Sequence, residues 1–217
     1  AWIHANWPRE ATEKAWRLLL MGITRARLRE PFRDVSLPIR PTALVAGGGP
    51  AGMTAALTLA RQGFQTTLVE RDGELGGMLR RIDRVYPADE SAEEMLAAFK
   101  TALERQKGLD VKLSSRIREI RGFIGNFSVR LDTFSGEENI RCGAIVLAMG
   151  ARAYRPEGLF RYGELPNVIT QMELELRLKK GLEREAQHVV FIQCVGSRNT
   201  ERLYCSSICC PITLKNA

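Results

Sequence analysis

The sequence lacks the features that mark several common classes of protein. Only two of its 217 residues are histidine, and it contains no Ser/His/Asp arrangement or paired-carboxylate signature that would indicate a hydrolase. No apolar run approaches the roughly 18 to 20 residues that a membrane-spanning helix needs. The first 30 residues carry too many charges for a secretory signal peptide. We therefore expect a cytoplasmic protein without a membrane span.

The chain also lacks a concentrated basic patch. It is basic overall, with 32 Lys and Arg residues against 25 Asp and Glu, but its arginines alternate with acids from one end to the other. This scatter argues against nucleic acid as a partner. The most basic stretch, residues 1 to 40, is compatible with an acidic protein partner or with cofactor phosphates. A solvated helix face is the simpler interpretation.

Cysteine is sparse, with five residues, yet four of them form a C-x10-C-x3-C-C array near the end of the chain. The four are Cys194, Cys205, Cys209 and Cys210. In a reducing compartment, clustered cysteines are metal ligands or redox groups more often than disulfides. Four thiolates suit an iron-sulfur cluster or a zinc ion, and the adjacent pair favours iron-sulfur because zinc sites favour C-x2-C pairs. A redox-active thiol pair and inert buried cysteines remain alternatives, and the isolated Cys142 is expected to be a core side chain.

Helical periodicity and proline content describe the start of the chain. Trp16, Leu19 and Ile23 recur at three- and four-residue spacing, which predicts a helix over residues 9 to 29. Three prolines between residues 31 and 41 are incompatible with a helix. We therefore expect an extended linker that leads into the first strand.

The middle of the chain predicts an α/β domain. Strands at residues 42 to 46 and 65 to 70, joined by a helix at residues 50 to 62, form a βαβ unit. Ser91 and Glu94 form a capping box that opens a helix to about residue 106. Further strands are expected at residues 111 to 113, 116 to 120, 127 to 133 and 139 to 148. They suggest a small antiparallel excursion that returns to a buried parallel strand.

The last part of the chain resembles the opening of a second α/β unit. We expect a helix at residues 171 to 180 and an apolar strand at residues 188 to 193, while residues 213 to 217 read as the start of a helix cut short. The sequence is therefore expected to be a fragment. Its expected domains are an N-terminal helix and linker, a dinucleotide-binding domain, and the start of a second α/β unit, at residues 1–40, 41–170 and 171–217.

The glycines after the first strand form a G-x-G-x-x-G motif. Gly47 permits a tight turn, Gly49 lets the backbone approach a pyrophosphate, and Gly52 allows close packing of helix on strand. The following helix N-terminus offers free N–H groups and partial positive charge. Glu70 ends the second strand, where an acidic side chain accepts hydrogen bonds from an adenosine ribose. An ordinary βα turn with a surface glutamate is the alternative, and the motif alone does not separate FAD from NAD.

Two later segments resemble those of flavoproteins with two dinucleotide-binding domains. They are Leu75-Gly76-Gly77-Met78 and the strand end Ala148-Met149-Gly150. The resemblance implies a Rossmann-like FAD-binding fold, in which the first segment passes along the FAD diphosphate or flavin and the second turns beside the nucleotide. Met149 stands where Thr or Ser is usual, which removes a hydroxyl. The expected FAD-binding residues are Gly47, Gly49, Pro50, Ala51, Gly52, Glu70, Arg71, Gly76, Gly77, Met78, Ala148, Met149 and Gly150.

The cysteine region carries a more specific resemblance. In the place where a pyridine-nucleotide disulfide reductase begins its NAD(P)-binding domain, only Gly196 remains of the glycine motif, and Cys194 stands in the turn. The stretches Gln193-Cys194-Val195-Gly196-Ser197-Arg198 and Tyr204-Cys205-Ser206-Ser207-Ile208-Cys209-Cys210 are similar to the flavoprotein subunit of heterodisulfide reductase. Trp2-Ile3-His4, residues 11 to 15 and residues 165 to 170 are similar to the same family. Pro211 departs from a simple helix and is expected to hold Cys210 out of helical geometry.

The resemblance implies that the four clustered cysteines ligate a [4Fe-4S] cluster near an FAD. It implies an oxidoreductase that passes electrons between the two, within a complex whose other subunits resemble those of heterodisulfide reductase, a hydrogenase, a dehydrogenase or a ferredoxin. A stand-alone NAD(P)H-dependent flavin disulfide reductase is one alternative, although the second glycine motif is missing. A non-enzymatic zinc-binding scaffold is the other. No residue is singled out as catalytic.

Overall fold

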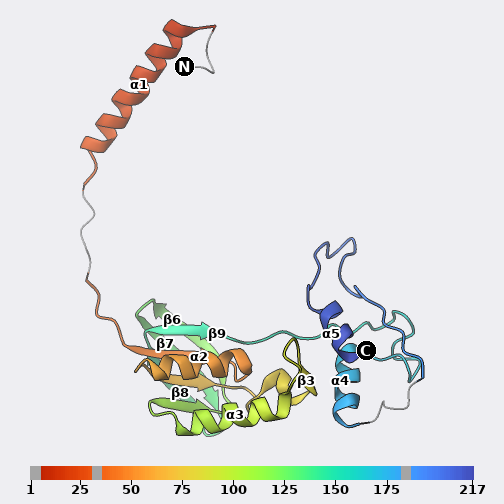
Figure 1. Cartoon of the computed structure of the whole chain (residues 1–217). Coiled ribbons are helices and arrows are strands. Elements are labelled where there is room, and N and C mark those ends of the chain that lie inside the picture. The colour runs from red at the N-terminus through yellow and green to blue at the C-terminus, as the bar shows by residue number, and fades with distance from the viewer. Residues whose placement is uncertain (1–5, 31–35, 182–186) are drawn as a thin grey trace. The chain divides into compact units, whose positions relative to one another are not determined.

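The computed structural model describes residues 6–30, 36–181 and 187–217. It separates into two units, Ala1–Leu37 and Pro38–Ala217. The first unit contains the helix α1, Pro8–Arg27, which confirms the predicted helix (Figure 1). Proline in its first turn and arginines in its last turn suit the two ends of a helix. None of the α1 residues is buried, and no helix of the described residues is long and apolar enough to cross a membrane.

The linker expected before the first strand lies partly outside the described residues, which omit 31–35. Residues 36–41 form neither helix nor strand, as the prolines predicted.

The second unit is built on a four-stranded parallel sheet. Its strands are β1 (Thr42–Ala46), β2 (Gln65–Val69), β5 (Leu109–Lys112) and β9 (Ala144–Leu147), in the order β5-β2-β1-β9. The helix α2, Pro50–Arg61, joins β1 to β2. These bounds confirm the predicted βαβ unit. Leu44, Val45 and Leu68 are fully buried, as expected of a parallel sheet that is covered on both faces.

The two faces of this sheet have different covers. On one face Val45 and Leu68 pack with residues of α2 and of α3, Ala92–Arg105, and the two helices lie side by side (Figure 1). On the other face Leu44 packs against an antiparallel sheet in the order β6-β7-β8. Its strands are β6 (Arg116–Phe123), β7 (Asn126–Thr133) and β8 (Gly136–Cys142). Successive residues of β1 therefore feed opposite cores, because side chains alternate along a strand.

Cys142 lies in the second of these cores. Its side chain is 1% exposed and contacts the cluster that contains Leu44 and Val129. Burial raises the pKa of its thiol, which disfavours the reactive thiolate. The prediction of a core cysteine is confirmed.

Two strand predictions need correction. The single strand expected over residues 139 to 148 is in fact β8 and β9, separated at Gly143. The Gly143 N–H donates to the Thr42 carbonyl (2.9 Å), and a Cβ there would collide with the Arg40 carbonyl. The close approach of another backbone segment thus breaks the strand. The strand predicted at residues 111 to 113 belongs to the parallel sheet as β5, and not to the antiparallel excursion.

Short elements complete the second unit. After β2 come the 3₁₀ turn η2 (Gly77–Arg80) and the antiparallel pair β3 (Arg84–Val85) and β4 (Glu90–Ser91). Later in the chain are the helices α4 (Gln171–Lys179) and α5 (Cys209–Asn216). The α4 prediction is confirmed.

The start of α4 is fixed by a capping box that the sequence prediction missed. The Thr170 hydroxyl accepts from the Glu173 N–H, and the Glu173 carboxylate accepts from the Thr170 N–H. Burial opposes ionisation of Glu173, but hydrogen bonds from Thr170 and from the Tyr162 hydroxyl outweigh it, so the pKa of Glu173 is lowered.

Two predictions at the end of the chain are wrong. Residues 188 to 193 form no strand, and Val190 is 86% exposed. A strand needs a hydrogen-bonding neighbour, and the described residues pair no strand with this segment. Cys210 is helical, because α5 already begins at Cys209 and places Pro211 in its first turn. Proline is tolerated there, since the N–H groups of a first turn have no intrahelical partner.

Candidate functional site

The loop between β1 and α2 folds tightly around its glycines. Gly47 has a φ of 113°, and a Cβ there would collide with the Ala148 carbonyl. A Cβ on Gly52 would collide with the Gly47 carbonyl. Both positions therefore require glycine, because strand end, helix start and β9 end pack backbone against backbone.

Gly49 differs from these two glycines. No atom lies within 4 Å of the position that its Cβ would occupy, so this residue faces open space. It is the N-cap of α2 and has no side chain to cap the first N–H groups of the helix. An open helix N-terminus without a side chain over it is suited to an anionic group such as a pyrophosphate.

A second glycine segment lies against this loop. The Gly76 N–H donates to the Gly48 carbonyl (2.8 Å), and a Cβ on Gly77 would lie 3.2 Å from the Gly49 Cα. Met78 follows in η2 and is 37% exposed. The structure therefore brings together two glycine segments that lie well apart in the sequence.

The end of β9 reaches the same loop. The Ala148 N–H donates to the Ala46 carbonyl (2.8 Å), and the chain then turns through Met149, which is 72% exposed, and Gly150, which has a φ of 68°. β2 and β9 flank β1 on opposite sides. The three segments thus meet at the carboxyl ends of the strands, at the point where strand order reverses, which is where open α/β sheets bind ligands.

Glu70 lies beneath this loop in an arrangement that the motif did not predict. It is 8% exposed; one carboxylate oxygen accepts from the Gly48 N–H (2.5 Å) and the other from the Asp72 N–H (2.9 Å). Each oxygen keeps a further lone pair for another donor. The carboxylate therefore fastens the glycine loop to the end of β2 in addition to any bond that it makes to a ligand.

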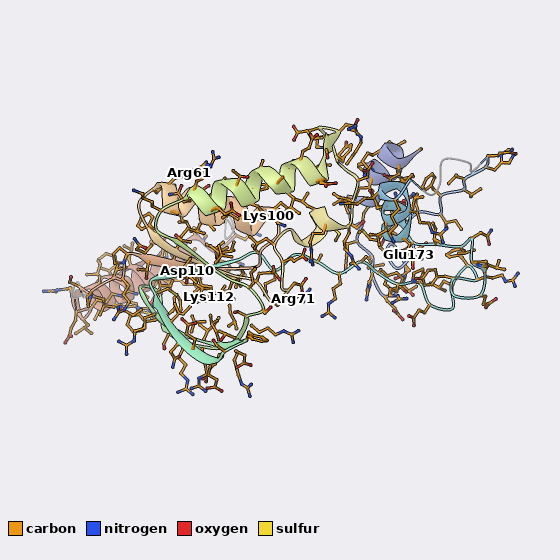
Figure 2. All side chains as sticks on the ribbon, turned by 90° about the horizontal axis from the view of Figure 1, so that it is seen from below. Arg61, Arg71, Lys100, Asp110, Lys112 and Glu173 are labelled. Carbon is orange, nitrogen blue, oxygen red and sulfur yellow. The ribbon has the colours of Figure 1, made fainter. Side chains whose placement is uncertain are left out.

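Arg71 follows Glu70 and is labelled in Figure 2. Its side chain is more than half exposed and lies 3.7 Å from the Asp72 carboxylate. Arg80 pairs with the same carboxylate at 2.8 Å. On the neighbouring strand β5, Lys112 pairs with Asp110 (3.2 Å) and with Glu138 (3.0 Å), and the hydrogen bond to Glu138 is the main cause that raises the pKa of Lys112 (Figure 2).

The four clustered cysteines lie around the loop that leads into α5. Cys194 adopts a left-handed conformation, with a φ of 60°. Its carbonyl accepts from the Ser197 N–H (3.1 Å), and the Arg198 N–H donates to the Tyr204 carbonyl (3.2 Å), next to Cys205. All four thiols are free. The loop thus returns the chain from Cys194 to Cys205 before α5 begins.

Electrostatics show that these thiols act on one another. A hydrogen bond from the Ser206 hydroxyl (3.4 Å) is the main cause that lowers the pKa of Cys209. Desolvation raises the pKa of Cys210, and so do the charges of Cys209, Cys194 and Cys205. Within the described part of the chain, however, no three Cys, His, Asp or Glu side chains are close enough together to hold a metal ion. The four thiols share one region without having ligand spacing.

Gly196 has a structural reason that the sequence did not reveal. A Cβ there would lie 2.6 Å from the ring of Tyr154, and the guanidinium of Arg202 lies 5.6 Å from the centre of that ring. Tyr154 therefore contacts both arms of the loop between Cys194 and Cys205. In the sequence Gly196 was interpreted only as what remains of a nucleotide-binding motif.

A buried ion pair holds α5, and sequence reasoning missed it. Lys215 donates to the Glu175 carboxylate (2.5 Å) and to the Arg84 carbonyl (3.0 Å), and the Lys215 and Glu175 side chains are 9% and 2% exposed. Asn216 donates to the same carboxylate oxygen (3.0 Å). Lys179 of α4 donates to the Arg80 carbonyl (3.3 Å). These bonds attach α4 and α5 to the segment that follows the second glycine pair, and nothing in the sequence distinguishes Glu175 from the exposed acids near it.

A parallel sheet in this order, with a glycine loop and a helix N-terminus at its switch point, defines a Rossmann-like dinucleotide-binding protein. The family model described as FAD dependent oxidoreductase matches residues 43–161. The chain belongs to this family. The predicted fold class is confirmed, and FAD is the cofactor that the family supports.

Relatives narrow the comparison. A subunit of the H(2):CoB-CoM heterodisulfide,ferredoxin reductase of Methanothermobacter marburgensis is 27% identical over 308 residues, which cover 100% of this chain and 47% of the relative. One of the CoB–CoM heterodisulfide reductase iron-sulfur subunits of Methanopyrus kandleri is 26% identical, with the same shares. Both are the subunit type that the sequence resembles, so the predicted resemblance is confirmed. The chain spans about half the length of these relatives.

Among solved structures, Lactococcus lactis thioredoxin reductase is 25% identical, with a TM-score of 0.47, over 57% of this chain and 41% of that chain.

Proposed function

We propose that this chain is the FAD-binding part of an electron-transfer oxidoreductase subunit similar to the flavoprotein subunit of heterodisulfide reductase. In this proposal electrons pass between FAD and a [4Fe-4S] cluster within a larger complex. The convergence of the two glycine segments and the Ala148–Gly150 turn on the open N-terminus of α2 is the observation that carries the proposal. The attachment of the cysteine-bearing α5 to the same unit through Lys215 adds to it.

The residues present fit FAD. The N-terminus of α2, with Pro50 and Ala51 in its first turn, would take the diphosphate over Gly49, which leaves open space where a Cβ would stand. Glu70 would orient the adenosine ribose with the lone pairs that its two backbone hydrogen bonds leave free. Gly76, Gly77 and Met78, with Ala148, Met149 and Gly150, would flank the remainder, and Arg71 would supply positive charge. FAD supplies one- and two-electron chemistry when bound.

The cysteine donor set fits an iron-sulfur cluster. The groups whose charges act on Cys210 are all thiols, and Fe–S clusters are held by Cys thiolates. A lowered pKa at Cys209 favours the thiolate form that ligation needs. The Methanopyrus kandleri relative is named as an iron-sulfur subunit. Cys194, Cys205, Cys209 and Cys210 are therefore the proposed ligands.

The proposed partners are other subunits of an electron-transfer complex. The relatives are named as subunits of heterodisulfide reductases, with hydrogen, formate or ferredoxin in some of the names. We infer that electrons are delivered by a ferredoxin, a hydrogenase or a dehydrogenase of such a complex. The free thiols support a cytoplasmic location, because a reducing compartment preserves them.

The proposed FAD site is tested by Gly49→Val. A branched side chain would occupy the open space over the helix N-terminus, so the purified variant should contain no FAD while its far-UV circular dichroism stays that of the wild type. Gly22→Val in α1 is the matched control, because Gly22 also has no atom within 4 Å of its Cβ position. A folded Gly49→Val protein that retains stoichiometric FAD would overturn the assignment.

A further inference from the structure

A chain of two hydrogen bonds connects the two cysteine-bearing segments. The side-chain amide of Gln193, next to Cys194, donates to the Thr213 hydroxyl (2.6 Å). That hydroxyl donates to the carbonyl of Cys209 (3.0 Å). A hydroxyl offers one donor and two acceptor sites, so Thr213 serves both bonds at once. The link runs from the residue before the first cysteine to the backbone of the third.

The second bond is common in helices, and the first is not. A Thr hydroxyl often bonds the carbonyl four residues earlier, as Thr12 does with Pro8 in α1 (2.7 Å). Gln193, in contrast, lies 20 residues from Thr213 in the sequence. Its bond closes a segment in which residues 187–208 form neither helix nor strand. Ordering such a loop opposes folding by its closure entropy, so a specific tertiary bond is needed to fix it.

The position of this link determines what it can do. Cys209 and Cys210 occupy the first turn of α5, whose far end is fixed by Lys215 and Glu175. Gln193 brings the Cys194 turn to the same helix. Both segments are therefore held to one rigid element before any ligand arrives.

We propose that Gln193 and Thr213 are positioning residues for the four-cysteine site. They hold the Cys194 turn at a fixed distance from Cys209 and Cys210, so that the thiols are arranged in advance of cluster binding. The inference rests on the proposed function, in which these thiols ligate the cluster. Neighbours that orient ligands change metal affinity by about 10- to 100-fold when they are removed.

The first test measures thiol proximity in the metal-free chain. In a background with Cys205→Ser and Cys210→Ser, the bifunctional thiol reagent dibromobimane should join Cys194 to Cys209, as peptide mapping would show. Gln193→Leu and Thr213→Val should each slow this cross-link about fivefold, the change expected when one tertiary hydrogen bond is lost. Combining them should slow it no further, because each removes the same link. Thr213→Ser keeps the hydroxyl and should restore the wild-type rate.

The second test measures cluster retention in the full chain with all cysteines present. After anaerobic reconstitution, Thr213→Val should release iron to a ferrous chelator about tenfold faster than the wild type, and Thr213→Ser should match the wild type. Thr12→Val removes the equivalent local bond in α1 and should change nothing.

Two outcomes would overturn the inference. One is an unchanged cross-linking rate in Thr213→Val and Gln193→Leu, and the other is an equal effect of Thr213→Ser and Thr213→Val. A wild-type chain that binds no iron would instead contradict the proposed function, and the cross-linking rates would still decide whether the link positions the thiols.

Discussion

At the scale of single residues, Glu70 fastens the glycine loop to the end of β2, and we predict that Glu70→Ala destabilises this loop. The change removes the acceptor for two N–H groups, those of Gly48 and Asp72, and an unsatisfied buried group costs about 1–3 kcal/mol. The free energy of unfolding in urea should fall by about that amount, and FAD should bind more weakly in a fluorescence titration.

Glu74→Ala is the control for this prediction. The Glu74 side chain is 67% exposed and meets Arg80 at 3.6 Å, a surface pair worth under about 1 kcal/mol. Equal stability of the Glu70 and Glu74 variants would contradict the role of Glu70.

Glu70 also separates what a motif predicts from what it does not. Its place at the end of β2 followed from its spacing to Gly47 in the sequence. Its bonds to backbone N–H groups did not, because a spacing rule gives the direction of a side chain and not the groups that it will meet. The same holds for Gln193 and Thr213, whose contact spans 20 residues of largely irregular chain.

At the scale of elements, local signals sufficed where proline and glycine mark the ends of an element. Pro50 and Gly63 bracket α2, and the apolar run before Gly47 is β1, so the βαβ unit was predictable within a residue. Strand pairing was not. Residues 188 to 193 have the composition of a buried strand, yet a strand is stable only beside another. The break between β8 and β9 likewise depends on the distant Arg40 carbonyl.

The attachment of α5 gives a prediction for a buried ion pair. In Lys215→Met the Glu175 carboxylate would stay buried without its cation, and such a loss costs about 3–5 kcal/mol. Amide hydrogens of α4 and α5 should then exchange faster, while those of the parallel sheet stay protected. Arg17→Met is the matched control, because Arg17 and Glu13 also meet at 2.5 Å but are 72% and 63% exposed. Unchanged exchange in α5 of the Lys215→Met protein would contradict the anchoring role.

At the scale of the whole molecule, the chain combines a dinucleotide-binding sheet with a cysteine-bearing helix attached to it. The family followed from motifs, since both glycine segments and the cysteine array are short and local. The attachment itself, through Lys179 and Lys215 to backbone carbonyls, leaves no sequence signature. The match covers 47% of the length of the Methanothermobacter marburgensis relative, so electron donors and acceptors belong to the proposal.

We predict that NADH and NADPH do not reduce the flavin of this chain directly. The turn after residue 193 offers Cys194 and the single glycine Gly196, whose Cβ position meets the Tyr154 ring, whereas phosphate binding needs several glycines and open N–H groups. Stopped-flow mixing of the FAD-loaded protein with each nucleotide should show no rapid bleaching. Fast bleaching that saturates with nucleotide would favour the stand-alone reductase.

The central claim is that one chain holds both FAD and a [4Fe-4S] cluster. The direct measurement is the flavin and metal content of the wild-type protein after anaerobic reconstitution, read from its visible spectrum and by elemental analysis. The account predicts about one FAD and roughly four irons per chain, the content of a cluster held by four thiolates. Zinc in place of iron, or a folded protein that takes up no flavin, would contradict it.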